Sequence, residues 1–118
     1  MEKTACFNNS ASRSIVEKYV DEASAMLGKN LVKVILYGSY ARGEERENSD
    51  IDLLFLTSLS DEENRREENA LYDTAFDYQM DYGVDISVIV KNKEQFEHWL
   101  GALPFYDNIE REGVVLNG

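Results

Sequence analysis

Apolar residues recur every three or four positions in several segments of the chain, a spacing that places them along one side of a helix. This periodicity predicts helices over about residues 14–27, 61–81, 92–103 and 105–112. Ser14 with Glu17, and Ser60 with Glu63, have the spacing of a capping box at a helix start. A helix with one apolar side must pack against another element, so a sheet or a further helix is required.

Shorter runs rich in branched residues alternate with these helices and predict strands. The runs cover about residues 31–37, 50–57, 84–90 and 114–116, the last as a short edge strand, and a helical turn is expected at 40–42. The fold class expected is α/β (α+β): a small mixed sheet with helices packed mainly on one face. No linker or internal repeat interrupts residues 1–118, which predicts a single domain.

Two carboxylates open the second predicted strand. Gly38 and Ser39 follow the first strand, and ten residues separate them from Asp50 and Asp52. Residues two apart in a strand point to the same face, so the two aspartates present their oxygens together. At the turn, Gly38 allows a close approach of the backbone, and Ser39 with the following amides is expected to hold phosphate oxygens.

Asp52 lies between apolar residues, where an acid needs a compensating partner. Mg²⁺ supplies one, because it prefers carboxylate, phosphate and water oxygens. Asp85 opens the third predicted strand as Asp50 and Asp52 open the second, and neighbouring strands lie about 4.8 Å apart. We therefore expect the three carboxylates to hold two Mg²⁺ ions, with Asp85 also able to accept a proton.

Other candidates are less specific. Arg42 either complements phosphate charge or forms a salt bridge in solvent. His98 stands alone on its predicted helix and is interpreted as structural. Five aromatic residues are interpreted as core rather than as a base-stacking surface: Tyr72, Phe76, Tyr78, Tyr82 and Trp99.

The formal net charge of −11 argues against DNA or RNA as a partner, because nucleic-acid binders need cationic surface. It suits a basic protein or a polycationic small molecule. The single cysteine, Cys6, excludes an internal disulfide. Neither a secretory leader nor a membrane-spanning run is recognised, so we expect a cytoplasmic protein without membrane contact.

The segments Tyr37-Gly38-Ser39-Tyr40-Ala41-Arg42-Gly43 and Asn48-Ser49-Asp50-Ile51-Asp52-Leu53 resemble the signature of the nucleotidyltransferase superfamily that includes DNA polymerase beta. The ending Asn108-Ile109-Glu110-Arg111-Glu112-Gly113-Val114 and the short chain resemble its minimal nucleotidyltransferase (MNT) branch. The resemblance extends from about residue 14 to 116.

The resemblance implies a polymerase beta-like fold and a nucleotide site at Gly38, Ser39, Arg42 and Ser49. It also implies two Mg²⁺ ions at Asp50, Asp52 and Asp85, with Asp85 helping to activate the attacking hydroxyl. MNT proteins are commonly antitoxins of HEPN-domain ribonucleases, and some transfer AMP from ATP to a tyrosine of the toxin.

We therefore expect a Mg²⁺-dependent transfer of AMP from ATP to a hydroxyl of a partner HEPN toxin. Two alternatives stay open at this point. One is the same chemistry on a small cationic acceptor such as an aminoglycoside, for which association into a homo- or hetero-oligomer would have to complete the pocket. The other is an antitoxin that neutralises its toxin by binding alone.

Overall fold

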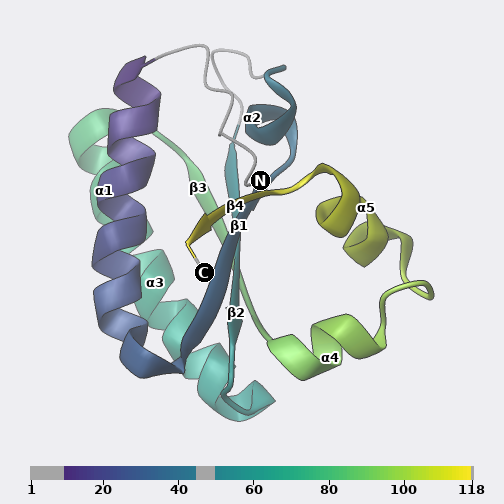
Figure 1. Ribbon diagram of the computed structural model, residues 1–118. Coiled ribbons are helices and arrows are strands. Elements are labelled where there is room, and N and C mark those ends of the chain that lie inside the picture. Colours follow the sequence, from purple (N-terminus) through teal and green to yellow (C-terminus); the bar gives the residue numbers. More distant parts are fainter. Residues whose placement is uncertain (1–9, 45–49, 118) are drawn as a thin grey trace.

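Four strands form one mixed sheet with helices on both of its faces (Figure 1). The computed structural model describes residues 10–44 and 50–117. The strands are β1 (Leu31–Tyr37), β2 (Ile51–Thr57), β3 (Ile86–Asn92) and β4 (Val114–Asn117), in the order β3-β2-β1-β4. β1 is antiparallel to β2 and β4, whereas β2 and β3 are parallel. The predicted mixed sheet is confirmed, including the short edge strand.

The two long helices, α1 (Ser10–Leu27) and α3 (Asp61–Tyr82), cover one face of the sheet (Figure 1). Alternate strand residues such as Leu36 and Leu53 are fully buried beneath them. Tyr19 of α1 is buried in this layer, and its hydroxyl donates a hydrogen bond of 2.8 Å to the Leu71 carbonyl of α3. Burial raises the pKa of Tyr19, which keeps this hydroxyl protonated as a donor.

Two short helices, α4 (Lys93–His98) and α5 (Pro104–Glu112), cover part of the opposite face (Figure 1). They contribute Phe96 and Ile109 to a second cluster over Ile35, Leu54 and Leu56. The prediction of helices mainly on one face therefore describes the long helices, while the short ones pack on the other side. The reason is that β2 is apolar at successive positions and must be shielded on both faces.

Several element boundaries differ from the prediction. α1 begins at Ser10, so Ser14 lies within the helix and is not its cap. The helix predicted to reach residue 103 ends at His98, because Gly101, with φ 87°, lies in the turn before Pro104. β3 begins at Ile86 instead of residue 84, so Asp85 directly precedes the strand.

Four of the five aromatic residues predicted for the core are exposed instead. Tyr78 is buried, whereas Tyr72, Phe76, Tyr82 and Trp99 are 44–52% exposed. Periodicity alone could not separate these positions, because an aromatic residue at the margin of a packed helix face has the same spacing as one inside it. No helix within the described segments has the length and apolar character needed to cross a membrane.

The start of α3 offers a test of the predicted cap. The Ser60 side chain accepts a hydrogen bond from the Glu63 amide, and the Glu63 carboxylate accepts one from the Ser60 amide. We expect Ser60→Ala to lower the free energy of unfolding by about 1 kcal/mol, measured by urea denaturation. Ser58→Ala, at an exposed bend just before the helix, serves as the control and should change it by less than about 0.5 kcal/mol.

Candidate active site

Gly38 joins β1 to the short helix α2 (Ser39–Arg42) and needs to be a glycine for two reasons. Its backbone has φ 77° and ψ −156°, a conformation that residues with a side chain rarely adopt. A Cβ at this position would also collide with the Asp52 carboxylate of β2. The missing side chain therefore lets the turn after β1 lie directly against the carboxylate.

The turn at α2 presents fewer phosphate-binding groups than expected. The amides of Ala41 and Arg42 donate hydrogen bonds of 3.1 and 3.2 Å to the Gly38 carbonyl. They are therefore engaged within the turn. The Ser39 hydroxyl and amide are the groups at the start of α2 that remain suited to phosphate oxygens.

Asp52 lies on the sheet face opposite α1 and α3, between two polar neighbours. In the strand register Tyr37 of β1 pairs with Asp52 on one side, and Ser87 of β3 pairs with it on the other. Asp50 directly precedes β2 and is exposed, while Asp52 is half-buried. Burial raises the pKa of Asp52, and the negative charge of Asp50 raises it further, against a smaller opposing effect of Arg42.

Asp85 is tied to the beginning of β2 through its backbone. Its carbonyl accepts a hydrogen bond of 2.8 Å from the Ile51 amide, so the starts of β2 and β3 lie side by side. Its carboxylate is exposed and accepts a hydrogen bond of 2.7 Å from the Gln79 side chain of α3. Asp50 and Asp85 line the same pocket, which has a volume of about 370 Å³.

The side chains fit Mg²⁺ by their chemistry, although they do not form a finished metal site. Among residues 10–44 and 50–117, no three His, Cys, Asp or Glu side chains are grouped closely enough to hold a metal ion. Asp50 and Asp52 do repel each other at the start of β2, and carboxylate oxygens are ligands that Mg²⁺ prefers. A cation would relieve this repulsion. The two-ion site with Asp85 stays a prediction.

Arg42 is engaged in surface ion pairs. Its guanidinium contacts the carboxylates of Glu44 and Glu112 at 2.8 and 3.3 Å, and the Glu44 hydrogen bond is the main cause that raises its pKa. It still lines a second hollow of about 230 Å³ with Gly38 and α5, so a contact with the nucleotide stays a prediction. Ser49 lies outside the described residues.

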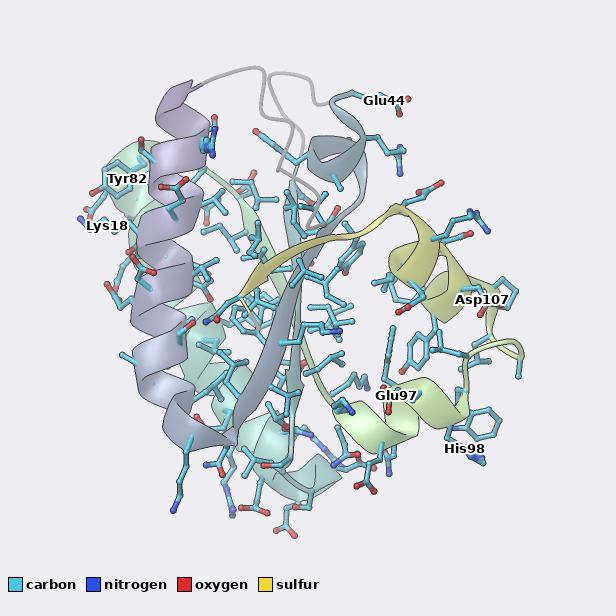
Figure 2. All side chains as sticks on the ribbon, in the orientation of Figure 1. Lys18, Glu44, Tyr82, Glu97, His98 and Asp107 are labelled. Carbon is cyan, nitrogen blue, oxygen red and sulfur yellow. The ribbon has the colours of Figure 1, made fainter. Side chains whose placement is uncertain are left out.

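His98 is exposed at the end of α4, with its ring against Trp99. Glu44, which follows α2, lies far from it at the other end of the molecule (Figure 2). The interpretation of His98 as structural stays a prediction.

The sequence analysis did not identify three residues as neighbours of the candidate carboxylates: Gln79, Tyr37 and Ser87. The register could have suggested Ser87, because a strand partner of Asp52 must share its face. No local signal marks Gln79, since it reaches Asp85 only once α3 has packed beside β3.

The described geometry places a glycine-serine turn against a strand that carries two aspartates, and residues 16–116 match the family model of the nucleotidyltransferase domain. The chain belongs to the nucleotidyltransferase domain family. A protein of Methanocaldococcus jannaschii, assigned by name as a protein adenylyltransferase, is 32% identical over 109 residues. The alignment covers 86% of this chain and 93% of that protein. The enzyme class, a nucleotidyltransferase, is thereby established.

Solved structures share the fold of this nucleotidyltransferase. A structure described as a minimal nucleotidyltransferase is 25% identical, with a TM-score of 0.56, and the match covers 88% of this chain and 92% of that one. A complex of a tri-AMPylated Shewanella oneidensis HEPN toxin with an MNT antitoxin matches at 17% identity and a TM-score of 0.50. That match covers 90% of this chain and 72% of the other chain. The expected fold is therefore confirmed.

The contact between Gly38 and Asp52 predicts a specific effect of adding one methyl group. We expect Gly38→Ala to lower the free energy of unfolding by about 2 kcal/mol or more, since both the backbone and the carboxylate must move. Gly83→Ala is the matched control: its φ of 70° is similar, but a Cβ there meets no atom within 4 Å. It should cost about 1 kcal/mol, measured by denaturant unfolding. Equal effects of the two substitutions would contradict the role of the contact.

The raised pKa of Asp52 predicts a pH-dependent effect of Asp52→Asn. The folded state binds this proton more readily than the unfolded state, so the ionised carboxylate destabilises the fold as pH rises through its raised pKa. In EDTA at pH 7 we expect the variant to be more stable by up to about 1 kcal/mol. The difference should vanish below about pH 4, where the ordinary carboxyl is also protonated. Thermal unfolding across this pH range measures it, and a destabilised variant at pH 7 would contradict it.

Proposed function

We propose that this nucleotidyltransferase transfers AMP from ATP to a hydroxyl group, that of a tyrosine, on a partner HEPN toxin, and thereby acts as its antitoxin. The protein adenylyltransferase name of the M. jannaschii relative supports a protein as acceptor. The AMPylated toxin bound to an MNT antitoxin of the same fold supports the class of partner. The acidic surface suits a basic protein partner.

The observation that carries the proposal is the contact between the Gly38 turn and Asp52. This contact supports a role for Ser39, which follows Gly38, in binding phosphate oxygens beside Asp52. In the proposed role, Asp50, Asp52 and Asp85 would hold Mg²⁺, which when bound neutralises phosphate charge and polarises the reacting phosphorus. The residues of the chain then act mainly by positioning.

The proposed transfer is a single nucleophilic substitution at the α-phosphorus of ATP. The acceptor oxygen forms a bond to the α-phosphorus of ATP, and the bond from that phosphorus to the oxygen bridging to the β-phosphate breaks. Pyrophosphate leaves with the bridging oxygen, and the hydroxyl proton passes to the Asp85 carboxylate. Ser39 holds the phosphate oxygens of the leaving group during this step, and Gln79 keeps Asp85 in place through its hydrogen bond of 2.7 Å.

The transfer is tested with α-labelled ATP, Mg²⁺ and the folded protein encoded by the adjacent gene. We expect the label to appear on that protein, and Asp52→Asn to slow labelling at least about a hundredfold, because a carboxylate that would hold the charge-neutralising cation is lost. Glu97→Gln is the control, since Glu97 forms only a surface ion pair with Lys93 on α4. It should label at the rate of the native chain, measured by gel autoradiography.

The same experiment separates the alternatives. Absence of label on a folded partner, with label instead on one of a panel of aminoglycosides, would replace the protein acceptor by a small cationic one. Neutralisation of the toxin by an Asp50→Ala, Asp52→Ala double variant at ordinary stoichiometry would show that binding alone suffices.

A further inference from the structure

A pocket opens where the second half of α3 passes the beginnings of β2 and β3. It has a volume of about 370 Å³, within the usual range of ligand pockets of roughly 300–1,000 Å³. Its lining residues are Asp50, Tyr72, Ala75, Phe76, Gln79, Asp85, Ile86 and Ser87. The pocket therefore combines apolar walls from α3 with the carboxylates of the candidate site.

The pocket and the turn at Ser39 lie on opposite sides of Asp52 in the sheet, because Asp52 pairs with β1 on one side and with β3 on the other. The strand order is β3-β2-β1, and the turn at Ser39 follows β1 (Figure 1). The pocket lies toward β3, because its lining includes Asp85, Ile86 and Ser87. In phosphoryl transfer the attacking and leaving oxygens are roughly in line through the phosphorus. If pyrophosphate leaves on the Ser39 side, the acceptor hydroxyl must approach from the β3 side. That side is where the pocket opens.

The walls of the pocket suit an aromatic ring. Phe76 is 52% exposed and lines the pocket, so part of its ring is open to a ligand there. Tyr72 is held beside it, because its hydroxyl accepts a hydrogen bond of 3.3 Å from the Val88 amide at the outer edge of β3. Two aromatic side chains that line a pocket together with a carboxylate can pack against a ring whose hydroxyl points toward the acid.

Gln79 gives the acidic end of the pocket a defined orientation. Its side-chain amide donates a hydrogen bond to Oδ1 of Asp85, and Oδ2, which takes no part in that bond, can accept a hydrogen bond from an incoming hydroxyl. Gln79 is thus a positioning residue: it acts through Asp85.

The surface around the pocket favours a basic protein segment over a free amino acid. Phe76 and Met80 continue an exposed apolar row along α3, and Met80 is 71% exposed. Asp73, Asp77 and Asp81 form an exposed acidic row at the same four-residue spacing beside it. A segment that carries apolar and basic residues on either side of its acceptor matches both rows.

We propose that this pocket is the acceptor site and takes the ring and hydroxyl of a tyrosyl side chain within a basic segment of the partner protein. Phe76 forms the wall against which the ring packs, and the Asp85 carboxylate accepts a hydrogen bond from the hydroxyl. The inference rests on the proposed transfer of AMP to a protein, because it names the binding site of the acceptor in that reaction.

A kinetic test distinguishes an effect on acceptor binding from an effect on nucleotide binding. With the full chain and the protein encoded by the adjacent gene, we expect Phe76→Ala to raise KM for the acceptor protein at least about fivefold, as loss of a well-packed aromatic contact does. KM for ATP should change by less than about twofold, and Phe76→Leu should recover part of the loss. Trp99→Ala is the matched control, an aromatic residue of 47% exposure that lies outside the pocket lining. It should leave both constants unchanged.

The opposite result overturns the assignment. A rise in KM for ATP with no change for the acceptor would mean that the pocket holds the nucleotide, and no change in either constant would mean that it holds neither. Unfolding midpoints of the variants, compared by circular dichroism, establish that each is folded at the assay temperature.

A second measurement decides the matter if the native chain labels no partner, which would be a failure of the proposed function. ¹⁵N-labelled chain is then titrated with the peptide acetyl-Arg-Tyr-Arg-amide and, for comparison, acetyl-Arg-Phe-Arg-amide. Amide shifts confined to the pocket lining, stronger for the tyrosine peptide and lost in Phe76→Ala, support the acceptor site. Shifts elsewhere, or none at millimolar peptide, overturn it.

Discussion

The site depends on the close approach of a glycine and a half-buried carboxylate on neighbouring strands. Gly38 leaves room for the Asp52 side chain because it has no Cβ, and its positive φ turns the chain directly into α2. The same contact brings the Ser39 turn beside the carboxylates without any further element. The candidate phosphate-binding turn and an acidic strand end are thus held together by backbone geometry.

The core on the opposite face fixes this contact. Leu36 pairs with Leu53, and both are buried under the long helices, so the next pair in the register, Tyr37 with Asp52, must face the other way. A slip by one residue would bury the aspartate and expose the leucine, an exchange that the apolar layer resists. The second face is covered by α4 and α5 over Ile35 and Leu54, and the site lies beyond that cluster. The position of Asp52 therefore follows from the placement of apolar residues.

The sequence predicted most of the strands and the convergence of Gly38 with Asp52, because these depend on local alternation and spacing. β1 has the predicted bounds, and α3 begins at its predicted capping box. The surroundings of Asp85 were not predictable, since Gln79 reaches it only through the packing of α3 on β3. Exposure of Phe76 was equally hidden, because spacing cannot show where a helix passes the edge of a sheet. Local rules therefore identified the strand-end acids, while long-range packing determined what lies beside them.

Electrostatics connects the stability of the fold to its substrates. The chain carries a net charge of −11, and at the site burial and Asp50 raise the pKa of Asp52, so the ionised pair opposes folding at neutral pH. A cation that binds only the folded state would remove the repulsion between Asp50 and Asp52. Its binding would therefore raise the free energy of unfolding by mass action. A triphosphate alone would add negative charge to the same place, a repulsion that prior or simultaneous binding of a cation would offset. The acidic row of Asp73, Asp77 and Asp81 on α3 would act on the proposed partner in the same way. It would attract a basic acceptor segment and repel an acidic one.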